Sequence, residues 1–187
     1  RLSRGLGDVY KRQGIYLPKY NGSIFEIMSA PISAYEIVIG YAGAAVSKSL
    51  LISVLILFTS TIFVDFYIKH PLLMLFLLIL ISITFSLFGF IVGIWATNFE
   101  KLQLIPLLII TPLVFLGGSF YSVEMLPELW QFVSKFNPIF YVINGFRWSF
   151  FGTADIGITT SLSFMITFLF ICLILSLIHI SEPTRQA

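Results

Sequence analysis

The 187-residue chain is 58% hydrophobic and only 11% charged, with a formal net charge of +2 and a mean hydropathy of +0.97. Because ordinary soluble domains carry about 25% charged residues, this composition excludes a soluble protein and indicates an integral membrane protein. The small net charge gives no basis for nucleic-acid binding. The single cysteine, Cys172, excludes an internal disulfide bond and a cysteine-based metal cluster.

The two ends of the chain differ in composition from the rest. Residues 1–13 are basic, contain glycine and have no apolar period, and residues 177–187 are similarly out of character. Both resemble adaptor-derived sequence at the edges of assembled reads. We therefore predict that both segments are non-native and leave them out of the fold. The expected transmembrane domain is residues 14–176.

Residues 18–40 hold two capping boxes, each with a serine three residues before a glutamate: Ser23 with Glu26, and Ser33 with Glu36. The first predicts a helix over about residues 24–30, ended by Pro31. A helix of about seven residues cannot hold itself together in water, so we expect its small apolar face, with Ile27 and Met28, to dock on another surface. The membrane interface of its own chain is one such surface. The second box predicts a surface helix ahead of the first span.

Four apolar segments are long enough to cross a bilayer, for which about 20 apolar residues suffice: residues 43–64, 71–99, 102–123 and 156–177. The fold class is therefore predicted to be all-α. The first segment contains Lys48, close enough to one end for its side chain to reach the headgroups. The third contains Pro106 and Pro112. Asp155 stands just before the fourth, where the dipole of a helix N-terminus favours a carboxylate.

Residues 124–152 are rich in aromatic side chains but are interrupted by charges and by two prolines. We predict two short helices, of which the first begins at Pro127 and presents one apolar face, made of Leu126, Leu129, Trp130 and Val133. The second has Asn137 as its N-cap, Pro138 at its first position and Gly152 as its C-terminal stop. Helices of about 11 to 14 residues extend only about 16 to 21 Å, which is less than the roughly 30 Å of hydrocarbon. The pattern therefore fits two arrangements, a re-entrant hairpin and a hydrophobic loop between two ordinary spans.

A small-residue turn, an LP pair, an NP pair and an arginine follow one another in this region: Gly117-Gly118, Leu126-Pro127, Asn137-Pro138 and Arg147. Together these motifs resemble the signature region of the ABC-2 family of ATP-driven export permeases. The resemblance covers about residues 18–175. It implies that these motif residues form a gate, built on a re-entrant hairpin at the external face. It also implies six transmembrane helices in a complete protein, so we expect two further spans to precede the four present here.

The same resemblance assigns the segment before the first span to coupling with an ATPase. It implies that the short helix sits in a cleft of that ATPase through these residues: Ser23, Glu26, Ile27, Met28, Ala30 and Pro31. Charge does not decide the orientation of the chain in the membrane, because lysine and arginine are divided evenly between the two sides. The resemblance puts residues 18–33, residues 100–101 and the C-terminus in the cytoplasm of a bacterial inner-membrane protein.

The function that the resemblance implies is that of a permease subunit of an ATP-binding-cassette exporter, working as a homodimer with a separate ATPase subunit. The sequence has no G-x-x-x-x-G-K-[ST] phosphate loop, so ATP and Mg²⁺ are expected on the ATPase. No cofactor, metal or enzymatic activity is expected on this chain. An ion-coupled secondary transporter is the alternative, but it usually needs intramembrane carboxylates, and no Asp or Glu lies centrally in a predicted span. A membrane enzyme would need paired catalytic groups, and the sequence shows none.

Overall fold

A computed structural model describes residues 33–64, 67–96 and 98–181, and all regular structure within these residues is helical. The helices, in chain order, are α4 (Ala34–Phe63), α5 (Pro71–Trp95), α6 (Phe99–Ile105), η1 (Pro106–Ile110), α7 (Thr111–Leu116), η2 (Val123–Met125), α8 (Glu128–Lys135), α9 (Pro138–Phe151) and α10 (Ile158–Ser181). η1 is a π-helical turn and η2 a 3₁₀ turn. The predicted short helix at residues 24–30 lies outside the described residues.

The first described helix, α4, begins at the second capping box. The Glu36 N–H donates to the Ser33 hydroxyl oxygen at 3.3 Å, and the Ser33 N–H donates to the Glu36 carboxylate at 2.7 Å. The helix then runs for 30 residues without a break. The prediction of a separate surface helix before a span at residue 43 is therefore wrong, because no proline interrupts the helical hydrogen bonds between the box and the apolar run.

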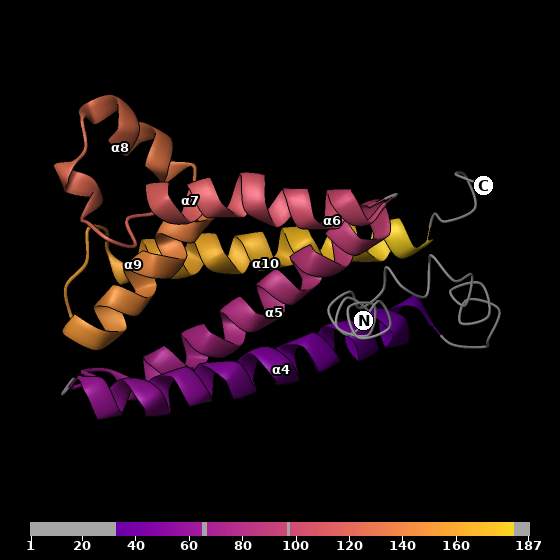
Figure 1. Cartoon of the computed structure of the whole chain (residues 1–187), viewed down its shortest axis with the longest axis horizontal. Helices are drawn as coiled ribbons and strands as arrows, with labels where there is room; N and C mark the ends of the chain where they lie inside the picture. Colours follow the sequence, from indigo (N-terminus) through magenta and orange to yellow (C-terminus); the bar gives the residue numbers. More distant parts are fainter. Residues whose placement is uncertain (1–32, 65–66, 97, 182–187) are drawn as a thin grey trace, which may run out of the picture.

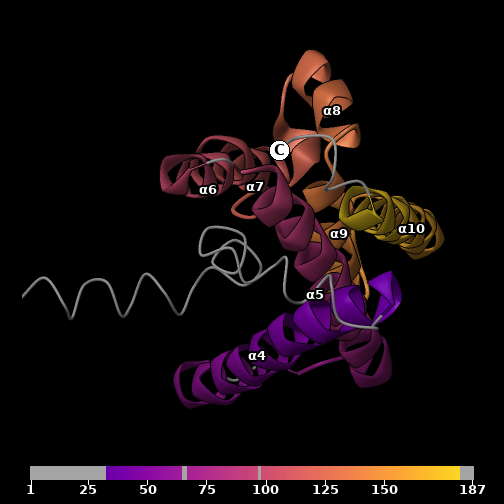
Figure 2. The same ribbon diagram turned by 90° about the vertical axis from the view of Figure 1, so that its right-hand side faces the viewer.

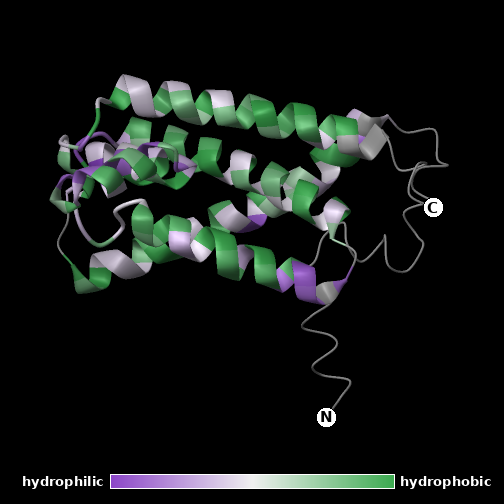
Figure 3. Ribbon diagram, turned by 90° about the horizontal axis from the view of Figure 1, so that it is seen from above, coloured by the Kyte–Doolittle hydropathy of each residue, from purple (hydrophilic) through white to green (hydrophobic). Residues whose placement is uncertain are grey.

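Three of the described helices are long and apolar enough to cross a membrane: Tyr35–Phe63, Pro71–Trp95 and Ile158–Ile178. Figure 3 shows that the long helices are hydrophobic over most of their lengths, with hydrophilic residues gathered toward the two ends of the bundle. The predicted spans at 71–99 and 156–177 correspond to α5 and α10, apart from a few residues at their ends.

The third predicted span, over residues 102–123, is not one uninterrupted α-helix. It consists of α6, η1 and α7 in direct succession and ends at Leu116. Prolines at positions 106 and 112 lack the N–H that a regular α-helix needs, and each ring crowds the carbonyl four residues earlier, which favours the wider π turn between them. Gly118 has a φ of +82°, a left-handed conformation that ends helices and suits glycine.

Helices α4, α10 and the α6–η1–α7 rod run along the long axis, and α5 crosses them obliquely (Figure 1). α5 packs against α4 on one side and α10 on the other, and α9 packs against both α10 and α5. The view along the bundle sets α6 and α10 apart with α5 between them (Figure 2). α8 and α9 lie together at the end where α4 passes into α5, opposite the turn from α5 to α6.

Two hydrophobic clusters hold these helices together. The first joins α4, α5 and α10 through Ile37, Val38, Ala42, Leu87, Phe90 and Cys172. The second joins α5, α9, α10 and the 3₁₀ turn through Leu77, Leu80, Val123, Phe140, Tyr141 and Met165. In the second cluster the rings of Tyr141 and Phe164 stack with their centroids 4.0 Å apart, which adds to the gain from burying apolar area. The second cluster fixes the hairpin region to the long helices.

Candidate functional site

The end of α7 is the point around which the predicted gate residues gather. Two of its last four carbonyl groups accept backbone N–H groups, that of Leu113 from Gly117 at 2.8 Å and that of Phe115 from Gly118 at 3.2 Å. Each of the four also accepts a hydrogen bond from a side chain further along the chain. The donors are Asn137 Nδ2 to Leu113, Ser119 Oγ to Val114 at 2.8 Å, Tyr121 Oη to Phe115 at 2.8 Å and Ser134 Oγ to Leu116 at 2.9 Å. An unpaired carbonyl is costly in an apolar environment, so these contacts stabilise the turn and the hairpin on α7.

Arg147, on α9, binds the turn that follows α7. Its Nη1 donates to both carboxylate oxygens of Asp155, at 3.0 and 3.1 Å. Its Nη2 donates to the carbonyl oxygens of Gly118 at 2.7 Å and Tyr121 at 3.2 Å. The planar guanidinium can make such directed contacts with three partners at once. Arg147 therefore joins α9, the segment before α10 and the turn after α7.

The Asp155 carboxylate is bound both by Arg147 and by the turn that follows α7. Its carboxylate accepts hydrogen bonds from the Ser122 hydroxyl at 2.8 Å and the Val123 N–H at 3.0 Å, in addition to those from Arg147. The sequence predicted that Asp155 is favoured by the dipole of the fourth span, but α10 begins only at Ile158. The structure instead places the Arg147 guanidinium and the polar groups of the turn against the carboxylate, contacts that the sequence did not predict.

The NP pair and the glycine stop have the predicted geometry. The Asn137 side-chain oxygen accepts from the Ile139 N–H at 3.0 Å, and Pro138 is the first residue of α9. Gly152 ends α9 with a φ of +74°. Pro127 differs from its prediction, since it precedes α8 in an extended conformation with ψ of 148°, and α8 has 8 residues rather than the predicted 11 or more. Leu126 is half-buried and packs against the second hydrophobic cluster.

On α8, two polar side chains face the rest of the described chain, whereas the large apolar side chains are exposed. Gln131 and Ser134 lie on the inward side, where Gln131 Nε2 donates to the carbonyls of Glu124 at 3.1 Å and Leu126 at 2.8 Å and where Ser134 is fully buried. The charged residues Glu128 and Lys135 are exposed. The outward face is apolar and 40–70% exposed, and consists of Leu129, Phe132, Val133 and Phe136. Of the residues on the predicted apolar face, Leu126 packs against the second cluster, whereas Leu129, Trp130 and Val133 pack against no core cluster of the described chain.

Asn144 joins α9 to the start of α10. It is 1% exposed, and its Nδ2 donates to the Ile156 carbonyl at 2.7 Å and the Ser161 hydroxyl at 2.8 Å. Its side-chain oxygen accepts from the Ile156 N–H at 3.2 Å. At the next position, a Cβ on Gly145 would meet the Leu77 side chain at 3.3 Å, so glycine lets α9 approach α5 closely.

The loop before α5 contacts the other end of α9. The N–H groups of Lys69 and His70 donate to the carbonyls of Phe150 at 3.2 Å and Ser149 at 2.9 Å. The His70 ring stacks on Trp148, with centroids 4.3 Å apart. Among the described residues, no group of three or more His, Cys, Asp or Glu side chains could hold a metal ion. The site is therefore a set of structural contacts between helix ends.

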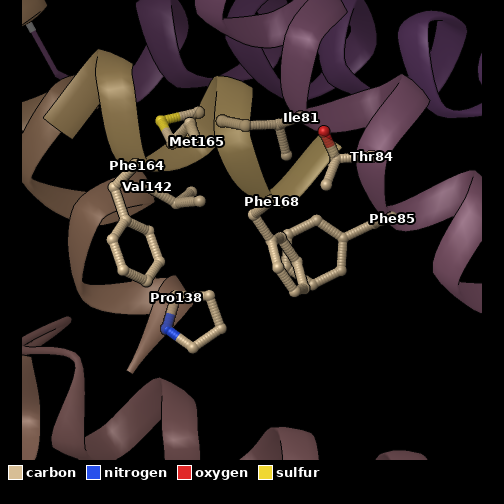
Figure 4. Close-up of a pocket in the computed structure, with 8 residues that line it drawn as sticks. All are labelled: Ile81, Thr84, Phe85, Pro138, Val142, Phe164, Met165 and Phe168. Atoms are coloured by element: carbon tan, nitrogen blue, oxygen red, sulfur yellow. The ribbon is translucent and has the colours of Figure 1, made fainter. Parts of the chain in front are cut away.

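An apolar pocket lies between α5, α9 and α10 (Figure 4). It is lined by Ile81, Thr84, Phe85, Pro138, Val142, Phe164, Met165 and Phe168. The Thr84 hydroxyl donates to the Leu80 carbonyl at 2.7 Å, so it is not directed at a ligand. The pocket has about 230 Å³ of empty space even when space open to the surroundings is included. That volume is below the roughly 300–1,000 Å³ of typical ligand pockets, and no ligand site is assigned to it.

Residues 13–151 match the family model described as ABC-2 type transporter. The chain therefore belongs to the ABC-2 type transporter family, and the resemblance carried by its motifs is confirmed. It is 36% identical over 151 residues to "Inner membrane transport permease YadH" of Escherichia coli strain K12. The aligned residues make up 81% of this chain and 59% of that protein. The YadH proteins of Escherichia coli O157:H7 and Shigella flexneri match to the same extent.

The chain spans about three fifths of the length of the curated relatives that it matches. No solved structure matches the chain. The three apolar helices and the inner-membrane relatives together identify a multi-pass inner-membrane protein.

The structure brings the predicted gate residues together, while the predicted coupling residues, Ser23 to Pro31, lie outside the described residues. Gly117 and Gly118 are buried beside the carbonyls that the hairpin binds. Sequence analysis missed the roles of Ser122, Ser134 and Asn144 and the pairing of Asp155 with Arg147. One signal was available, since a lone carboxylate close to a lone arginine between apolar segments predicts an ion pair. The serines and Asn144 left no such signal.

Proposed function

We propose that this chain is the permease subunit of an ATP-binding-cassette exporter, which moves a substrate across the bacterial inner membrane. The observation that carries this proposal is the match of residues 13–151 to the ABC-2 transporter family. Hydrolysis of ATP with Mg²⁺ takes place on a separate ATPase subunit, and two permease copies form the pathway. An ion-coupled transporter fits less well, because Asp155, which the structure pairs with Arg147, lies outside the apolar part of α10.

The α6–η1–α7 rod is proposed to be the third of four spans in this chain. Its three parts have 7, 5 and 6 residues, which together extend about 27 Å at 1.5 Å per residue. This length is close to the roughly 30 Å of hydrocarbon. The rod also runs from the α5–α6 turn to the opposite end of the bundle (Figure 1), as a crossing segment must.

We propose that α8 and α9 form a re-entrant hairpin that closes the external side of the pathway. With 8 and 14 residues they extend only about 12 and 21 Å, so neither can cross alone. The outward apolar face of α8 is suited to the acyl chains and headgroup boundary of the outer leaflet. Arg147 would be costly in that region without a partner, and its pairing with Asp155 removes most of this cost.

The coupling role of residues 24–31 can be tested in the complete permease, co-expressed with its ATPase. Replacing Ile27 and Met28 with aspartate should abolish co-purification of the ATPase, because two charges replace the small apolar face that we expect to dock. Membrane insertion should be unchanged. The conservative pair Ile27→Val and Met28→Leu should retain the ATPase, and Thr153→Asp, on the other side of the membrane, should do the same. Full ATPase recovery with the two aspartates would rule out this coupling surface.

The topology of the hairpin can be tested with single cysteines in a Cys172→Ser background. Glu124, Lys135 and Thr153 are exposed and lie before, within and after the hairpin. All three cysteines should react with a membrane-impermeant thiol reagent added from outside, whereas Glu100→Cys, at the start of α6 and exposed, should react only in permeabilised membranes. Labelling of Lys135→Cys from the cytoplasmic side alone, with the other two labelled from outside, would mean two full crossings instead of a hairpin.

A further inference from the structure

The middle of the α6–η1–α7 rod departs from regular α-helical geometry. The Thr111 N–H donates to the Pro106 carbonyl, five residues back rather than four. The backbone at both borders of η1 stays in the right-handed helical region, so the rod is continuous. Pro106 and Pro112 remove two N–H donors from this stretch. Such π turns inside helices are frequent at functional sites, and sharp bends in helices are found at prolines and π turns.

The packing of the rod changes along its length. No residue of η1 or α7 is buried among the described residues, and the main contacts of η1 are with α6 and α7, its own neighbours in the chain. At the end of α7, by contrast, the side chains of Ser119, Tyr121, Ser134 and Asn137 bind the last four carbonyls. Arg147 then ties the following turn to α9. The rod is therefore fixed at its α7 end and is loosely held at η1.

We propose that η1 is a hinge about which α6 moves relative to α7, while α7 stays fixed to the hairpin. Bending at η1 breaks few contacts, because the prolines have already removed two hydrogen bonds and the side chains of η1 are not buried in the described chain. Bending beyond Leu116 would instead break the hydrogen bonds made by the hairpin. The inference extends the proposed function, in which the α6 end faces the ATPase and the α7 end carries the external gate.

Spin-label distance measurements on the purified chain in lipid nanodiscs test the hinge without a substrate or an ATPase. In a Cys172→Ser background, one label pair joins Gln103 in α6 to Thr167 in α10, and the other joins Phe115 in α7 to Thr167. All three positions are exposed. The Gln103–Thr167 distances should be at least twice as widely distributed as the Phe115–Thr167 distances. Replacing Pro106 and Pro112 with alanine should restore a regular α-helix and narrow the first distribution to the width of the second.

Pro127→Ala is the matched control, because it also removes a proline next to a helix but lies outside the rod, and it should leave both distributions unchanged. The hinge is overturned if the two pairs show equally narrow or equally wide distributions, or if the proline replacements leave the Gln103–Thr167 distribution wide. Because no ATPase is present, these results are separate from those of the coupling test. A chain that does not recruit an ATPase still gives a result for the hinge, because the spin-label distances are measured on the chain alone.

Discussion

Replacing Arg147 with methionine should lower the free energy of unfolding by about 3 kcal/mol. Methionine keeps most of the apolar stem but leaves the Asp155 carboxylate without a counter-charge, and the Asp155 side chain is only 11% exposed. It also removes both donors from the carbonyls of Gly118 and Tyr121. Breaking a buried ion pair costs about 3–5 kcal/mol, and the low end applies because Arg147 is 24% exposed. Equilibrium unfolding of the purified protein in mixed micelles measures the loss.

Two further variants separate the charge from the hydrogen-bond geometry. Arg147→Lys keeps the positive charge but cannot reach several acceptors with a planar fork, so its loss should be intermediate. Adding Asp155→Asn to Arg147→Met removes the unpaired charge and should recover part of the stability. Lys135→Met is the control, since it removes an exposed cation of the same hairpin and should change stability by less than about 0.5 kcal/mol. Equal losses for Arg147→Met and Lys135→Met would contradict the role assigned to the ion pair.

The helices of this chain could be predicted because their causes are local. Apolar runs of sufficient length gave the regions of α4, α5 and α10, and the capping box at Ser33 and the Asn137-Pro138 pair gave two helix starts that the structure has. The ends were harder to predict. The α7 helix stops at Leu116, seven residues before the predicted limit, because Gly118 adopts a left-handed conformation that no hydropathy pattern records.

The contacts of the candidate gate could be predicted only in part, because they join segments that are distant in sequence. Asn137 was assigned a capping role through its oxygen, which the structure has, but its nitrogen binds the Leu113 carbonyl 24 residues earlier. Likewise, Ser134 binds Leu116 across 18 residues. These partners are backbone carbonyls, which every residue possesses, so no side-chain pattern could identify them. Helical spacing likewise predicted that apolar residues of α8 share a face, but it does not say what covers that face.

Asn144 offers the second large effect, because it is a buried amide whose donors and acceptor are all used. Replacing it with leucine, which has a similar size, leaves the Ile156 N–H and carbonyl and the Ser161 hydroxyl without this partner. Each buried polar group left unpaired costs about 1–3 kcal/mol, so the total loss should be about 3 kcal/mol or more. The same unfolding measurement in mixed micelles gives its value.

A graded series shows whether this loss comes from hydrogen bonds or from shape. Ser161→Ala removes one partner and should cost about 1 kcal/mol. In the Asn144→Leu background it should cost less, because the serine hydroxyl has already lost the amide, and the difference measures their coupling. Gln103→Leu, which replaces an exposed amide in α6, should be nearly neutral. Additive losses for Asn144→Leu and Ser161→Ala would mean that the two side chains do not interact. Apolar packing around Met165, rather than the buried amide, would then hold α9 to α10.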